Sequence, residues 1–117
     1  MAKGATIQRI ATPSAILVGL PEDLAAQCTE ALADGGLKVF KVGHVAAACE
    51  RIPVVMPQLV VTPTNLAPFD ADTLADRCVA VGAEILKIAP DQDRRALMVQ
   101  LKDAANMALI RALRRGS

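Results

Sequence analysis

The sequence predicts an α/β fold in which a parallel sheet of four or five strands lies between two layers of helices. Four short apolar runs recur along the chain, each about as long as a strand buried on both faces. The segments between these runs carry apolar residues at helical spacing, and a longer helical pattern closes the chain. Strands that alternate with helices form a parallel sheet whose crossover helices cover both faces. We therefore expect a three-layer sandwich with a long C-terminal helix.

Length and composition fit one globular domain. The chain has 117 residues, of which 53% are apolar and 21% are charged, and its net charge is +1. This is enough apolar material for one core, and the charges are too balanced to attract nucleic acid or an anionic membrane. Two phenylalanines are the only aromatic residues, so bases have almost nothing to stack on. We expect a flexible lead-in over residues 1–13 and a single domain over residues 14–117, with no nucleic-acid binding and no membrane insertion.

The predicted strands are bounded by glycine or proline. Gly19 ends the first run, and the pair Gly35-Gly36 precedes the second. Pro57 and Pro63 bracket the third run, because proline lacks the N–H that a central strand must donate. The four strands are expected at residues 15–18, 37–42, 58–62 and 84–88.

Three crossover helices are predicted from their end signals. The first begins at Pro21, which is followed by two acidic residues that favour the positive end of the helix dipole. The second is short, covers residues 46–52 and ends before Pro53. The third is expected to be capped by Asp70 or Asp72 and to end at the next glycine.

The last helix is predicted over residues 91–115, which gives a length of about 37 Å at 1.5 Å per residue. One face is apolar and is expected to pack on the sheet; it consists of Leu97, Leu101, Ala104, Ala105, Ala108 and Ala112. Apolar residues also occur away from this face, either as ordinary surface residues or as a contact for a partner. Arginines in the last turns complement the negative end of the helix dipole. The candidate interaction residues are Val99, Met107, Ile110, Arg111 and Arg114.

The cysteines and the single histidine do not form a recognisable reactive site. Cys28, Cys49 and Cys78 each fall on a different helix, on or near its apolar face, where a thiol packs as a small hydrophobe. His44 follows the second strand without an acid or second base near it in sequence, so we expect it to cap a helix or face solvent. We therefore expect no catalytic residue, no metal site, no cofactor and no enzymatic activity. The odd, dispersed number of cysteines favours a reducing, cytoplasmic location.

Four segments carry a resemblance to a known family. They read AILV at 15–18, LADGGLKV at 32–39, PQLVV at 57–61 and GAEILK at 82–87. Their type and order resemble the response-regulator receiver domain of bacterial two-component signalling, over about residues 14–90. The resemblance implies a receiver-like, or flavodoxin-like, arrangement of the sheet.

The resemblance also implies where phosphorylation chemistry would lie. Receiver domains use two acids after the first strand and an aspartate acceptor after the third, which hold Mg²⁺ through oxygen ligands, together with a lysine after the last strand. In this chain the positions of the acids fall on Gly19 and Leu20 and the position of the acceptor falls on Pro63; only the lysine has a counterpart, Lys87. About 24 residues separate the third strand from that lysine, where the family has one more βα unit. The resemblance therefore implies a degenerate, shortened receiver that is not controlled by aspartyl phosphorylation.

A second resemblance is to cobalamin-binding domains, on residues 37–43 and 57–62. Those domains carry a DxHxxG motif after the first strand, and its histidine coordinates cobalt. The corresponding residues 19–24 read GLPEDL and contain no histidine, so cobalt ligation of that kind is excluded.

Two functions remain open from the sequence. A degenerate receiver keeps its docking surfaces, so the first is a protein–protein interaction module, an adaptor or regulator in bacterial intracellular signalling. Its partner would be another signalling protein or a second copy of the chain. The alternative is a small-ligand or cofactor-binding domain that uses the crevice at the carboxyl ends of the strands. Its candidate residues are Gly19, His44, Thr62, Thr64 and Asn65.

Overall fold

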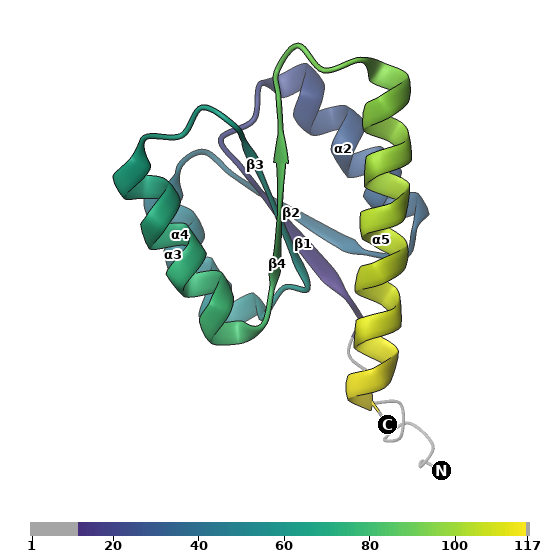
Figure 1. Ribbon diagram of the computed structural model, residues 1–117. Coiled ribbons are helices and arrows are strands. Elements are labelled where there is room, and N and C mark those ends of the chain that lie inside the picture. Colours follow the sequence, from purple (N-terminus) through teal and green to yellow (C-terminus); the bar gives the residue numbers. More distant parts are fainter. Residues whose placement is uncertain (1–11, 117) are drawn as a thin grey trace.

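The computed structural model describes residues 12–116, in which strands and helices alternate throughout (Figure 1). The elements are β1 (Ser14–Val18), α2 (Glu22–Asp34), β2 (Lys38–Val42), α3 (Val45–Val55), β3 (Leu59–Pro63), α4 (Pro68–Val81), β4 (Glu84–Ile88) and α5 (Arg94–Gly116). Residues 1–11 of the predicted lead-in lie outside the described residues. Pro13, in contrast, is buried, and its carbonyl accepts a hydrogen bond of 2.9 Å from the N–H of Lys38. None of the helices in residues 12–116 is both long and apolar enough to cross a bilayer.

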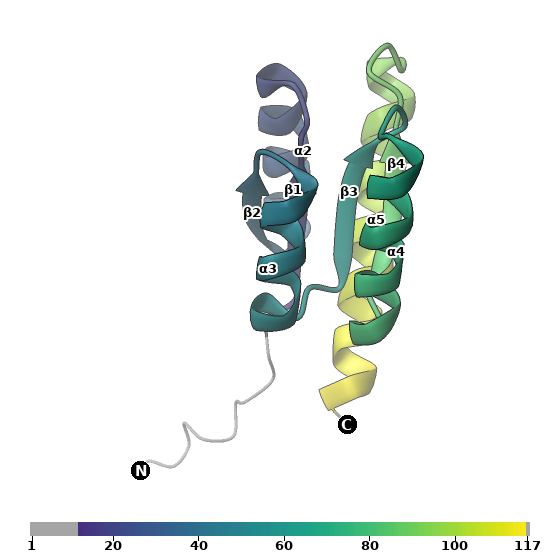
Figure 2. The same cartoon turned by 90° about the vertical axis from the view of Figure 1, so that its left-hand side faces the viewer.

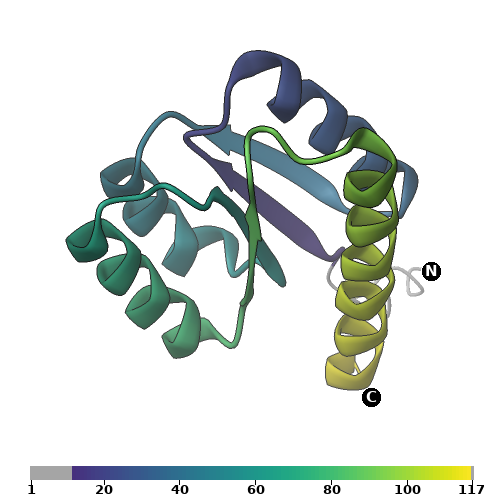
Figure 3. The same ribbon diagram turned by 45° about the horizontal axis from the view of Figure 1, so that its top comes forward.

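The sheet has four parallel strands in the order β2-β1-β3-β4. Its central register places Ile16 of β1 opposite Phe40 on one side and Val60 on the other, and Val60 opposite Ile85 of β4. Helices α2 and α5 lie on one face, and α3 and α4 lie on the other (Figures 2 and 3). The predicted three-layer α/β sandwich is confirmed, and residues 12–116 contribute four strands to its sheet.

Two apolar clusters form the core, one on each face of the sheet. Because side chains alternate along a strand, Leu17 and its neighbours at alternate positions point toward α2 and α5, whereas Ile16 and Val18 point toward α3 and α4. The predicted inner face of α5 is confirmed: Leu101 is fully buried, and the other apolar residues of that face are buried except Ala104, which is half-buried.

The end of α3 differs from the prediction. The helix does not end before Pro53 but includes it and continues to Val55. Pro53 lies in the last turn of α3. The hydrogen bond that it cannot donate is therefore one of the last in the helix, and few bonds follow it. The N–H of Met56 still reaches the carbonyl of Ile52 at 2.8 Å, and Met56 then ends the helix with a left-handed φ of 53°.

Strand β3 also extends further than predicted. Pro63 is its last residue, although the strand is central in the sheet. Pairing between β1 and β3 runs only as far as Leu17 opposite Val61, so the missing N–H of Pro63 falls beyond that pairing. On the other side of β3 the ladder continues, since the N–H of Thr64 donates to the carbonyl of Ile88 at 3.1 Å.

Two helix starts differ from the predicted caps. Helix α4 begins at Pro68, before both predicted aspartates, because proline suits the first turn, where its missing N–H would be unpaired in any case. Helix α5 begins at Arg94 rather than at residue 91. Asp93 caps it: the N–H of Ala96 donates to the carboxylate of Asp93 at 3.1 Å.

Candidate functional site

The carboxyl edge of the sheet is where a parallel α/β fold would hold a ligand, and at this edge β1 is followed by Gly19 and Leu20. Gly19 has a left-handed φ of 63°, and its N–H donates to the carbonyl of Val42 at 2.9 Å. A Cβ at this position would lie 3.6 Å from the carbonyl oxygen of Gly43. The next residue, Leu20, packs against the α2/α5 cluster of the core. Neither position after β1 therefore offers a polar side chain to a ligand.

The ends of β3 and β4 form a polar hollow against α4. The hollow has a volume of about 150 Å³, and Thr62, Pro63, Thr64, Asp72 and Lys87 are among the residues that line it. Thr62 and Pro63 are buried, whereas Lys87 is exposed on β4 directly opposite Thr62. This arrangement brings together two of the candidate ligand residues, Thr62 and Thr64, but not the others.

Asp72 is a member of this hollow that the sequence analysis treated only as a helix cap. It lies on the second turn of α4, on the side of the helix that meets the end of the sheet. Its place in the sequence, soon after the loop that follows β3, was a signal for this location. The hollow thus has one carboxylate and one ammonium group. Among the described residues, no three His, Cys, Asp or Glu side chains gather closely enough to hold a metal ion.

His44 is a structural cap. It is the N-cap residue of α3, and its Nδ1 accepts a hydrogen bond of 3.2 Å from the N–H of Ala47. The prediction of a capping role is confirmed, and His44 does not line the polar hollow.

The cysteines are packed as the sequence predicted. Cys28 and Cys78 are buried in opposite core clusters, and Cys49 is half-buried. Burial raises the pKa of the Cys28 thiol to about 11. Burial, with a smaller contribution from Cys49, likewise raises the pKa of Cys78 to about 11. At neutral pH both buried thiols stay protonated, and a protonated thiol is a poor nucleophile and metal ligand.

Helix α5 separates the candidate interaction residues into different environments. Val99 and Ile110 are exposed at 58% and 36%. Leu113, which the sequence analysis did not single out, is exposed at 55% and lies on the same side of the helix at 100° per residue. We call Val99, Ile110 and Leu113 the outer row of α5. Met107 is exposed too; it lies one turn before Ile110 on the helix and lines the groove beside β4.

The two arginines also differ. The guanidinium of Arg111 forms an ion pair with Glu84 at the start of β4 and donates to the carbonyl of Gln58 at 3.1 Å. Arg111 therefore fastens α5 to the amino edge of the sheet, which the sequence could not indicate because its partners lie far away in the chain. Arg114 is exposed near the end of the helix.

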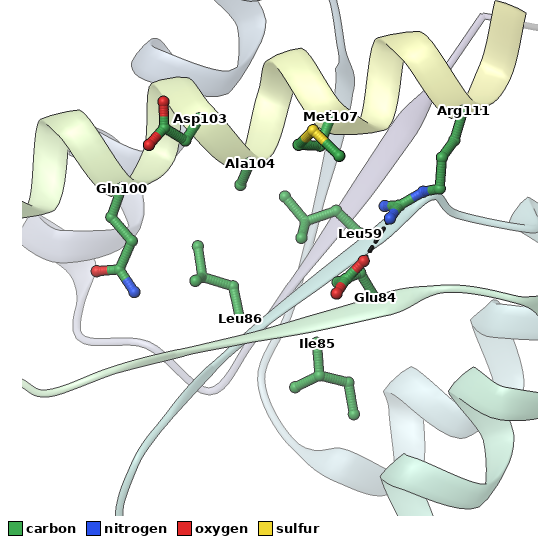
Figure 4. A pocket seen from close by; sticks show the side chains of 9 residues that line it. All are labelled: Leu59, Glu84, Ile85, Leu86, Gln100, Asp103, Ala104, Met107 and Arg111. Atoms are coloured by element: carbon green, nitrogen blue, oxygen red, sulfur yellow. Dashed lines mark hydrogen bonds and ion pairs between the residues drawn. The ribbon is translucent and has the colours of Figure 1, made fainter.

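A groove runs between α5 and β4 (Figure 4). It has a volume of about 310 Å³, and apolar side chains of β3, β4 and α5 form much of its lining. Gln100 and Asp103 border it on the helix, and the pair Glu84–Arg111 closes one end. The groove is the larger and more apolar of these two hollows beside β4.

Comparison with known proteins identifies the fold. No protein-family model and no curated protein matches the chain. Among solved structures, it is similar to the signal receiver domain of a protein described as a Luxo repressor, from Vibrio parahaemolyticus, with a TM-score of 0.61. The alignment covers 92% of this chain and all of that domain, at 18% sequence identity. The chain has the receiver fold. In this receiver fold the strands follow the order 2-1-3-4, and the last helix is long.

Proposed function

We propose that this chain is a non-catalytic, receiver-like protein–protein interaction module, an adaptor or regulator in bacterial intracellular signalling that is not controlled by aspartyl phosphorylation. The observation that carries the proposal is the residue at the end of β3. Where the receiver resemblance places the acceptor aspartate, this chain has Pro63, a buried residue without a carboxylate.

The surroundings of Pro63 support the same proposal. Gly19 and Leu20 stand at the positions of the two acids, and neither has an oxygen ligand on its side chain. Phosphoryl transfer to a carboxylate depends on a cation that neutralises the transferred group, and Mg²⁺ is bound through oxygen atoms, mostly of carboxylates and water. Asp72 is the one carboxylate that lines the polar hollow, and Lys87 is its one ammonium group. One carboxylate and one ammonium group are too few to hold the Mg²⁺ ion and the phosphoryl group that the receiver reaction requires.

The exposed surface supports an interaction role. The outer row of α5 presents large apolar side chains to solvent, and Arg114 lies next to Leu113 at one end of it. A surface of this kind suits contact with another signalling protein or with a second copy of the chain, in the cytoplasm. A small-ligand function of the polar hollow is less well supported, because its volume of about 150 Å³ is smaller than the roughly 300–1,000 Å³ of ordinary ligand pockets.

A titration with Mg²⁺ followed by beryllofluoride, which mimics a bound phosphoryl group, tests the proposal. In NMR spectra of the isotope-labelled protein we expect no saturable shifts at Thr62, Thr64 or Lys87. The variant Asp72→Asn is the control, because any weak, non-specific effect of Mg²⁺ should be the same in both proteins. Saturable shifts at these residues that Asp72→Asn abolishes would contradict the proposal.

A further inference from the structure

Strand β4 is an open edge of the described sheet. It is the outermost strand, paired only with β3. The N–H of Glu84 donates to the carbonyl of Gln58, and the carbonyl of Ile88 accepts from the N–H of Thr64. Because backbone groups alternate between the two sides of a strand, Glu84 and Ile88 point toward β3, whereas Ile85 and Lys87 point outward. The N–H and C=O groups of these two residues therefore line the open edge.

Helix α5 leaves the outer strand partly uncovered. Its buried side chains, such as Leu101 and Ala105, pack with β1, β3 and α2. Leu86 of β4, on the same face of the sheet, is only half-buried, and Met107 is 53% exposed. The groove described above is the space that this placement leaves beside the open edge (Figure 4).

We propose that an extended segment of a partner protein binds along β4 as a further strand. It would bond to the outward backbone groups of Ile85 and Lys87 and place an apolar side chain in the groove next to Leu86. Strand addition of this kind takes its affinity from the main chain and its specificity from pockets for alternate side chains. The inference deepens the proposed function, on which it rests, by naming the surface and the kind of segment that it takes.

The charged side chains beside β4 indicate which kinds of residue the bound segment carries on each side. Glu84 is already paired with Arg111, whereas Asp103, exposed on the rim of the groove, has no ion pair within residues 12–114. A basic side chain beside the apolar one would complement Asp103. Lys87 lies on the other face of the sheet, and its ammonium group would repel a second basic side chain there. The predicted segment therefore has apolar and basic residues on the α5 side and neutral or acidic residues on the other.

Selection from a random library of short linear peptides tests this inference with the intact chain. We expect enriched peptides that alternate in the predicted way, and those with neutral residues opposite Lys87 should bind the wild type and Lys87→Ala equally. Lys87→Pro removes an outward N–H without removing a bond to β3, so it should weaken binding of these peptides at least tenfold. Circular dichroism will show whether this variant is folded. Asp103→Lys lies on an exposed helix surface and should invert the preference from basic to acidic peptides.

Other outcomes would overturn the inference. Peptides that bind Lys87→Pro as tightly as Lys87→Ala, or a selection without enrichment, would show that the edge takes no strand. If the chain without residues 1–11 binds the peptides much more tightly, the occupant is the chain's own N-terminal segment. If sedimentation reveals a dimer that Lys87→Pro dissociates, the occupant is a second copy. None of these results depends on the Mg²⁺ titration. The proposed function can therefore be refuted while strand addition is supported, and strand addition can be refuted while the proposed function is supported.

Discussion

Replacing Leu101 by alanine is expected to lower the free energy of unfolding by about 3 kcal/mol. Leu101 is fully buried on the inner face of α5, in the cluster that joins this helix to α2 and to the sheet. The substitution removes apolar contacts and leaves a cavity that the surrounding strands cannot fill. Since the chain has no tryptophan or tyrosine, urea unfolding followed by circular dichroism is the suitable measurement.

Val99→Ala is the matched control on the same helix. Val99 is 58% exposed on the outer row, so its truncation should change the free energy of unfolding by about 0.5 kcal/mol or less. Equal losses in the two variants would mean that α5 does not pack on the sheet through the face described.

Gly35→Ala is expected to destabilise the protein by about 2 kcal/mol. Gly35 follows α2, and a Cβ there would lie 2.6 Å from the Cβ of Ala105 on α5. The backbone itself would accept alanine, because its φ is −81°. The expected loss is therefore purely steric, and it arises because α2 and α5 meet too closely at this point for any side chain. Urea unfolding of the variant measures it.

A double-mutant cycle with Ala105→Gly identifies the cause. Ala105→Gly alone should cost about 1 kcal/mol, because glycine is a poor helix residue. In that background Gly35→Ala should cost much less than in the wild type, since the opposing methyl group is absent. Gly36→Ala is the control: Gly36 has a φ of 96° and no atom within 4 Å of an added Cβ, so its loss comes from backbone strain and should not depend on residue 105. Strictly additive effects of Gly35→Ala and Ala105→Gly would contradict the packing described.

Much of the fold could be predicted because its signals are local. The uninterrupted apolar run at β1 matches a strand with both faces buried, and the apolar face of α5 follows from helical spacing alone. The ends of α3 and β3 were harder to predict, because Pro53 and Pro63 were expected to lie outside the helix and the strand. The N–H that Pro63 lacks falls beyond the pairing of β1 with β3, whereas Pro53 lies in the last turn of α3, so the hydrogen bond lost there is one near the end of the helix.

The sites were harder to predict, because they depend on how elements lie side by side. Asp72 reaches the polar hollow only because α4 packs across the end of β3. Arg111 was expected on an interaction surface, yet it holds Glu84, which is 27 residues away in the chain. The groove beside Leu86 exists because α5 packs over β1 and β3 and leaves the outer strand partly bare. The spacing of residues along the sequence does not reveal which helices and strands lie next to one another.

We propose that this chain, which has the receiver fold, does not undergo aspartyl phosphorylation. The most direct measurement is the intact mass of the protein after incubation with acetyl phosphate and Mg²⁺, compared with a sample that received Mg²⁺ alone. We expect identical masses, because Pro63 stands at the end of β3, where the receiver resemblance places the acceptor aspartate. A mass increase of one phosphoryl group, lost on treatment with hydroxylamine and absent in Asp72→Asn, would contradict it.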